Sequence, residues 1–215
     1  MKQSYDFNIK QIKNLSVEEK NSRQKNLDLF YKSGFPSKQV EDWKFTDLNL
    51  ILSKNFKSIS NEVNFESTKE FETIKNFEHN YISLNNGKII SSSFAYEDTN
   101  KILIKDFDQK EPTNFNPANT LTLLNSALSS GGFSLEVTKN YKLKKPLIIY
   151  NYFSKDLDNK ILNNKNFIKL NEGSELTLID YNDGHVQSNF IKNTVDTVSL
   201  EDNAVLKNIL IQESK

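Results

Sequence analysis

The sequence predicts a mainly β protein with N-terminal helices (α+β), whose core is a right-handed parallel β-helix (β-solenoid) that is incomplete at the C-terminus. Three seven-residue segments each place two aliphatic residues six apart around a central Asn or Gly; they are Val137–Leu143, Leu170–Leu176 and Leu200–Leu206. The central residues Asn140, Gly173 and Asn203 recur at spacings of about 33 and about 30 residues, a period typical of solenoids and propellers.

Each of these segments lies between two apolar strand patterns, and its central residue is of a type that tolerates positive φ. A single turn of such a chain cannot bury its apolar face alone, so neighbouring turns must stack. A β-sandwich with recurrent four-residue turns is the competing fold. Three turns that recur in one frame favour the β-helix, with Asn140, Gly173 and Asn203 at equivalent corners.

The N-terminal region is predicted to be helical to about residue 52. Ser16 and Glu19 match a capping box, in which each side chain binds a free backbone N–H at the start of a helix. Gly34 and Pro36 end this helix. A second short helical segment is expected over Lys38–Trp43. Residues 53–80 carry no clear period and are read as loop or irregular helix.

The middle of the chain predicts a hairpin, a strand and a helix. Asn86-Gly87 accepts the positive φ of a tight turn between two apolar runs. A strand is expected at Ile102–Ile104 and a helix at Asn116–Leu128, closed by the pair Gly131-Gly132. The chain is therefore divided into residues 1–80 (helical region), residues 81–132 (strand and helix leading into the core) and residues 133–215 (first turns of the β-helix).

Composition excludes several classes of protein. With 15 Phe, 8 Tyr and a formal net charge of +0, the chain is neither disordered nor basic enough for a typical nucleic-acid binder. It has no cysteine, so it can form no disulfide and offers no thiolate to zinc or to an iron–sulfur cluster. It carries neither a signal peptide nor a membrane-spanning run. We expect a soluble, cytoplasmic protein with no membrane or nucleic-acid partner.

Two segments resemble one known family. Gly34-Phe35-Pro36, followed by Glu41-Asp42-Trp43-Lys44-Phe45-Thr46, resembles the N-terminal signature of SufD proteins. Asn125-Ser126-Ala127-Leu128, then Gly132-Phe133 and Lys145-Pro146-Leu147, is similar to the way these proteins lead into their β-helix. The sister subunit SufB is similar only loosely in its N-terminal part, so the run Trp43–Thr46 favours SufD.

The resemblance implies a non-enzymatic scaffold subunit of the SUF iron–sulfur cluster assembly complex, the SufBCD complex. Its implied partners are SufB and the ATPase SufC, and a cluster is held only transiently, in the complex. We therefore assign no catalytic, cofactor-binding or metal-binding residue to this chain alone. The chain stops within the strand-rich part of the family pattern, which predicts a C-terminal truncation. The final turn would then expose its apolar residues, Leu206, Ile209, Leu210 and Ile211.

Few single residues are candidates for a site. His79 and His185 are the only histidines, and nothing in their spacing brings them together as metal ligands. Trp43 is expected to pack between the N-terminal helices. The lysines at 142, 144 and 145 predict a solvated face, or a surface for an acidic partner.

A second class of function is a carbohydrate-active β-helix enzyme, a polysaccharide hydrolase or lyase. Such chemistry needs paired carboxylates on one face. Asp180, Asp183 and Asp196 would supply them if they stack in adjacent turns. The helical N-terminal region and the missing secretion signal argue against it. An interaction scaffold with unrelated partners is a third possibility.

Overall fold

The computed structural model describes residues 4–63, 72–107, 119–183 and 188–212 as a mixed α+β structure with few helices and mostly sheet. Its helices are α1 (Val17–Ser33), α2 (Leu48–Asn55) and α3 (Thr120–Leu128). Its strands are β1 (Ser4–Asp6), β2 (Ser58–Ser60), β3 (Asn80–Asn85), β4 (Lys88–Ser93), β5 (Ile102–Asp106), β6 (Phe133–Val137), β7 (Leu147–Tyr152), β8 (Lys160–Leu170), β9 (Glu175–Asn182), β10 (Phe190–Leu200) and β11 (Val205–Gln212).

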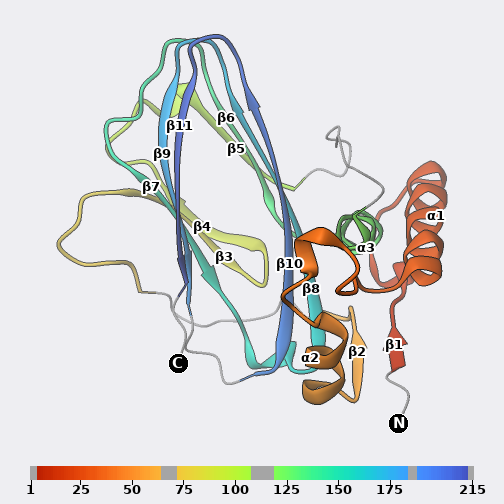
Figure 1. Ribbon diagram of the computed structural model, residues 1–215. Helices are drawn as coiled ribbons and strands as arrows, with labels where there is room; N and C mark the ends of the chain where they lie inside the picture. Colours follow the sequence, from red (N-terminus) through yellow and green to blue (C-terminus); the bar gives the residue numbers. More distant parts are fainter. Residues whose placement is uncertain (1–3, 64–71, 108–118, 184–187, 213–215) are drawn as a thin grey trace.

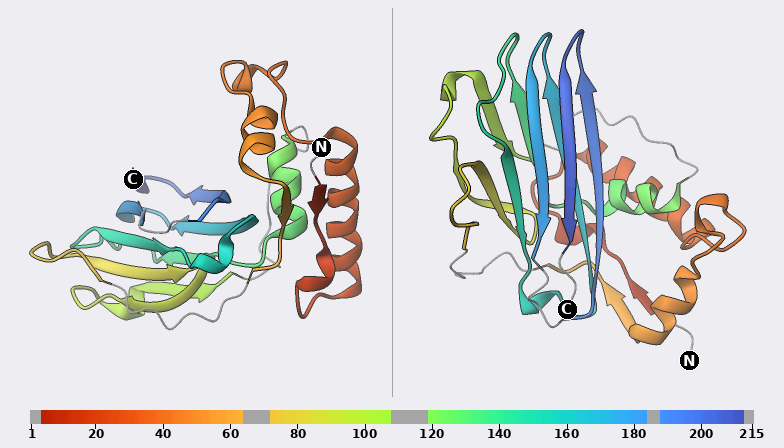
Figure 2. Two further views of the ribbon diagram at one scale, coloured as in Figure 1. Left: turned by 90° about the horizontal axis from the view of Figure 1, so that it is seen from below. Right: turned by 60° about the vertical axis from the view of Figure 1, so that its left-hand side comes forward.

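These strands form two mixed sheets that face each other (Figures 1 and 2). Sheet A, as we call the first, has the order β1-β2-β8-β6-β5, with β10 on the other edge of β8. Sheet B has the order β11-β9-β7-β3-β4. The outer strands β5 and β4 pair antiparallel with β6 and β3, and the remaining ladders are parallel.

From residue 133 the chain alternates between the two sheets, and Ser134 pairs with Phe167 and Leu147 with Leu178, offsets of 33 and 31 residues. We call residues 133–152, 160–182 and 190–212 the first, second and third repeats. Lys160 pairs with Phe190 and Glu175 pairs with Val205, an offset of 30 residues in both sheets of the last two repeats. Constant parallel register of this kind places equivalent residues of successive repeats above one another.

The corners between the sheets confirm the predicted turn residues. Asn140, Gly173 and Asn203 all have positive φ, at 59°, 66° and 57°. The backbone N–H of Asn140 donates to the carbonyl of Glu172 at 2.8 Å, and that of Gly173 donates to the carbonyl of Asp202 at 2.9 Å. The corners of the first and second repeats are therefore each hydrogen-bonded to the repeat that follows.

The helices cover the outer face of sheet A at one end of the strands (Figure 1). A shared core of α1, α2, α3, β2 and β8 joins them to the sheet; it contains Leu27, Phe30, Phe35, Leu52, Phe56, Ile59, Leu124, Leu128 and Ile161. The capping box of Ser16 and Glu19 is confirmed at the start of α1. Gly34, with a φ of 72°, ends this helix as predicted.

Several local predictions need correction. The segment Lys38–Trp43 forms only a short 3-10 helix, Glu41–Trp43. Trp43 is half-buried and lies outside the helical core, which the phenylalanines fill instead. The N-terminal region also contributes β1 and β2 to sheet A, which no sequence pattern predicted.

The pair Gly131-Gly132 does not cap α3, because Ser129 holds that position. The glycines instead allow close contact with β8. An ideal Cβ on Gly132 would lie 1.9 Å from the carbonyl oxygen of Lys165. The predicted hairpin is confirmed, with Asn86 and Gly87 at φ values of 48° and 84°. The predicted start of α3 at residues 116–118 lies outside the described residues, where the first helical residue is Thr120.

Candidate functional site

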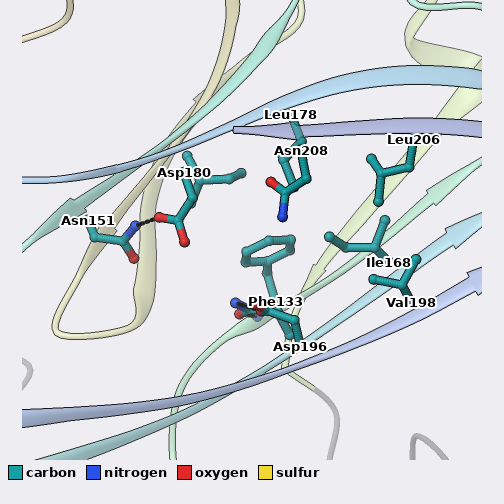
Figure 3. Close-up of a pocket in the computed structure, with 11 residues that line it drawn as sticks. Phe133, Asn151, Ile168, Leu178, Asp180, Asp196, Val198, Leu206 and Asn208 are labelled. Atoms are coloured by element: carbon teal, nitrogen blue, oxygen red, sulfur yellow. Dashed lines mark hydrogen bonds between the residues drawn. The ribbon is translucent and has the colours of Figure 1, made fainter. Parts of the chain in front are cut away.

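The space between the two sheets is apolar at one end of the strands and polar at the other. Near the corners, aliphatic side chains from both sheets fill it; they include Leu135, Val137, Ile168, Leu170, Leu176 and Leu178. Toward the other end, the inward positions carry Asn151, Asn166, Asp180, Lys192 and Asp196. In Figure 3 the ring of Phe133 lies between Asn151 and Asp180 on one side and Ile168, Val198 and Leu206 on the other.

Amide side chains hold the two inward carboxylates from neighbouring repeats. Asn151 Nδ2 donates to Asp180 Oδ1 at 2.6 Å, and Asn182 Nδ2 donates to the same oxygen at 3.3 Å (Figure 3). On the opposite sheet, Asn166 Nδ2 donates to Asp196 Oδ1 at 2.7 Å. Since every donor lies one repeat before its carboxylate or on the same strand, the polar contacts follow the stacking of the repeats.

Lys192 places a cation close enough to both carboxylates to interact with their charges. Its Nζ donates to Asn182 Oδ1 at 2.5 Å. Burial lowers the pKa of Lys192, and the charges of Asp180 and Asp196 partly oppose this effect. Burial likewise raises the pKa of Asp180; Lys192 opposes this rise and the nearby charge of Asp196 adds to it. These three residues form a charged cluster inside the sheet pair.

A cavity of about 530 Å³ opens beside this cluster. It is lined by Asp180, Asp183, Asp196, Lys192, Asn182, Thr194, Gln212, Phe153, Phe190 and Leu210. A second cavity of about 30 Å³ lies further inside (Figure 3). A space lined by carboxylates, amides and one ammonium can hold water or a small polar molecule and can exchange protons with it.

The predicted acidic residues meet here, but not in the predicted arrangement. Asp180, Asp183 and Asp196 all line the larger cavity. Asp180 lies on β9 of sheet B and Asp196 on β10 of sheet A, so the two face each other across the core instead of stacking in one sheet. Among the residues that the structure describes, no group of three His, Cys, Asp or Glu side chains is placed to bind a metal.

His79 contributes to the fold outside this cavity. Its Nδ1 lies 2.6 Å from the carbonyl oxygen of Phe77, and its Nε2 lies 2.9 Å from the hydroxyl of Tyr150. Tyr150 also accepts a hydrogen bond from the Ile74 backbone N–H at 2.9 Å. These contacts tie the segment before β3 to the outer face of sheet B. His185 lies outside the described residues.

The lysine-rich corner is exposed, as predicted, but two of its side chains pair within the chain. Lys142 forms an ion pair with Glu175, and Lys145 forms one with Glu78 at 2.5 Å. The backbone N–H groups of Lys144 and Lys145 both donate to Glu97. Contacts within the fold therefore engage the ammonium groups of Lys142 and Lys145 and the backbone of Lys144.

Sequence reasoning did not identify Lys192 or the asparagines around the cavity. A signal was present, because Asn163-Asn164-Lys165-Asn166 places four polar residues inside a strand whose neighbours are aliphatic. Polar side chains in such a strand need partners when they are buried. The partners come from other strands, so the local pattern alone could not name them.

A comparison with protein families places this geometry in context. The model of a family described as "SufBD protein N-terminal region" matches residues 2–149, well over half of the chain. A search of curated proteins found no match. No helix among the described residues has both the length and the hydropathy needed to cross a membrane.

Proposed function

The chain belongs to the SufBD family, and on this premise we propose that it is a SufD-like scaffold subunit in iron–sulfur cluster assembly. The observation that carries the proposal is the family match over residues 2–149. The run Trp43–Thr46, which favours SufD over SufB, falls within the matched region. The proposed role is cytoplasmic and involves no catalysis by this chain.

The stacked repeats support a β-solenoid as the scaffold. Parallel ladders whose offset is 30 residues in both sheets between the last two repeats, and corner residues that all have positive φ, are features of such a core. A solenoid is rigid along its axis, because each repeat is hydrogen-bonded to the next. It can therefore hold partner subunits at a fixed separation.

The composition supports a scaffold that does not itself store a cluster. Clusters are held by cysteine thiolates, with histidine as an occasional substitute. This chain has no cysteine and two histidines, and His79 is engaged with Tyr150. The proposed partners are a SufB-like subunit and a SufC-like ATPase, which would supply the cluster ligands and the ATP-driven motion.

The surroundings of the cavity carboxylates weigh against a polysaccharide hydrolase. Asp180 and Asp196 line one cavity, but both carboxylates are bound by asparagine side chains, and Lys192 lies near both. The family match gives the scaffold a support that the hydrolase lacks.

A genetic experiment tests the proposed function. The gene is deleted in its source cells, and the activity of an enzyme with a [4Fe–4S] cluster is compared with that of a cluster-independent enzyme. We expect the first activity to fall at least severalfold, the second to stay constant, and the gene to restore the first. Equal activities in the deletion and parent strains under iron limitation would contradict the proposal.

A further inference from the structure

The ammonium group of Lys192, which lines the cavity of about 530 Å³, has hydrogen-bonding capacity that the fold does not use. It donates to Asn182 Oδ1, and among the described residues no carboxylate lies within ion-pair distance of it. An ammonium carries three N–H donors. Burial lowers the pKa of Lys192, so an anionic partner in the cavity would favour its charged form. Lys192 therefore offers donors to a ligand.

Thr194 supplies a second polar group without a partner. Its hydroxyl oxygen is buried, and no described residue forms a hydrogen bond with it. Thr194 follows Lys192 by two residues on β10, so both side chains point to the same side of sheet A, and both line the cavity. A buried hydroxyl that lacks a partner costs free energy. An anionic group bound at Lys192 would also give this hydroxyl an acceptor.

Asp180 and Asp196 offer acceptors to the same cavity. The asparagine amides bind Oδ1 of each carboxylate (Figure 3), and no hydrogen bond from the described part of the chain reaches either Oδ2. Both charges act on Lys192 from beyond ion-pair distance. A molecule in the cavity can therefore accept hydrogen bonds from the ammonium at one end and donate them to a carboxylate at the other.

The remaining walls and the charge of the lining restrict the ligand further. The rings of Phe153 and Phe190 lie 4.9 Å apart between centroids and, with Leu210, give the cavity an apolar side. Its volume falls within the range of small-molecule pockets. Two carboxylates and one ammonium leave negative charge in excess, and Asp183 adds to it. The lining therefore suits a ligand that has both charges, a net positive charge and an apolar chain.

We propose that this cavity binds a free basic amino acid, with L-lysine as the reference ligand. Its α-carboxylate accepts hydrogen bonds from Lys192 and Thr194, and its ammonium groups donate to Asp180 and Asp196. Its methylene chain packs against the apolar side of the cavity. The site goes beyond the proposed scaffold function and does not depend on it.

Calorimetric titration of the full chain at pH 7 and constant ionic strength tests the ligand class. L-Lysine is compared with cadaverine, which is lysine without its carboxylate, and with glutarate, which has two carboxylates and no ammonium. We expect saturable binding of L-lysine, at least tenfold weaker binding of cadaverine, and no saturable binding of glutarate. If L-lysine does not bind, the cavity holds only water and the proposal is wrong. Cadaverine that binds as tightly as L-lysine would show a merely acidic cavity and would also overturn it.

Two variants assign the binding to the cavity. Lys192→Met should weaken L-lysine at least tenfold and leave cadaverine no weaker than in the wild type, a change in preference that a general loss of structure would not produce. Thr194→Val keeps the shape of the side chain without the hydroxyl and should weaken L-lysine severalfold. Lys207→Met, on exposed β11 and outside the cavity lining, is the control and should stay within a factor of about two of the wild type. An unchanged preference for L-lysine over cadaverine in Lys192→Met would contradict the proposal.

Discussion

Gly173 faces Asn140 across neighbouring repeats, and an ideal Cβ on Gly173 would lie 2.5 Å from Asn140 Oδ1. The two residues occupy the same corner of successive repeats, both with positive φ. Asparagine pays a modest cost for this conformation and glycine almost none. The corner therefore uses glycine where a Cβ would force the Asn140 side chain of the adjacent repeat to move.

Replacing Gly173 tests this corner. Gly173→Val introduces a β-branched residue at positive φ and a clash with Asn140, so it should lower the free energy of unfolding by roughly 1–3 kcal/mol. The midpoint of urea denaturation measures the change. Asn203→Gly is the control at the equivalent corner of the third repeat and should shift the midpoint little. A neutral Gly173→Val would show that the corner tolerates a side chain.

Glu97 is expected to make stability depend on pH in the acid range. Its carboxylate accepts hydrogen bonds from Asn80 Nδ2, the hydroxyl of Tyr141 and the backbone N–H groups of Lys144 and Lys145. Burial alone would raise the pKa of Glu97, but these hydrogen bonds outweigh it and hold the pKa below its ordinary value. The ionised form is therefore favoured in the folded state.

A lowered pKa means that the unfolded chain binds the proton first as the pH falls. The stabilisation from Glu97 is complete above the ordinary glutamate pKa of about 4.3 and is lost as the pH falls below it through the lower folded-state pKa. Glu97→Gln should reduce stability at pH 7 by roughly 1–3 kcal/mol and flatten the loss between neutral and acid pH. If the free energy of unfolding changed with pH by the same amount in the wild type and the variant, this role of Glu97 would be contradicted.

Lys192 is expected to stabilise the folded state by compensating the charges of the carboxylates around it. Lys192 and Asp180 are half-buried, so removing the ammonium leaves the Asp180 carboxylate poorly compensated, and Lys192→Met should cost roughly 1–2 kcal/mol of unfolding free energy. Adding Asp180→Asn to this variant should recover part of the loss, because it removes a stranded charge. Lys207→Met on exposed β11 is the control and should change stability little. Additive effects of Lys192→Met and Asp180→Asn would show that the two residues do not interact.

The purified chain alone is expected to hold no iron–sulfur cluster, because it has no cysteine. Anaerobic reconstitution with iron and sulfide, followed by desalting and visible absorption spectroscopy, is the measurement. We expect the spectrum of the untreated protein. A stable chromophore with stoichiometric iron would mean that other side chains bind a cluster.

The parts of the fold that the sequence predicted are those determined by local chemistry. Asn86-Gly87 formed its tight turn, and Ser16 and Glu19 formed their capping box, because each depends only on nearby backbone. The three-residue strands β1 and β2 depend instead on partners distant in sequence. Asn80 in β3 pairs with Leu147 in β7, and no local period records such a pairing.

In the candidate site, too, the sequence predicted the residue types but not their arrangement in space. Asp180 and Asp196 stood out as acidic residues in strand patterns, but their positions on opposite sheets depend on how the chain alternates between sheets. The local sequence around Lys192 does not distinguish it from other strand lysines, because its partners Asn182 and Asp180 come from another strand. Trp43 stood out as an aromatic in a helical segment, yet Phe30 and Phe35 took the core. Competition between aromatics for one core is decided by packing in three dimensions.

The most direct test of the scaffold role is affinity purification of the tagged full chain from its source cells, with quantitative mass spectrometry of the proteins that co-purify. The proposed function predicts that a SufB-like and a SufC-like subunit are enriched together, at least tenfold over a tagged control protein of unrelated fold. Recovery of the intact chain with neither subunit, under conditions in which both are expressed, would contradict the scaffold role.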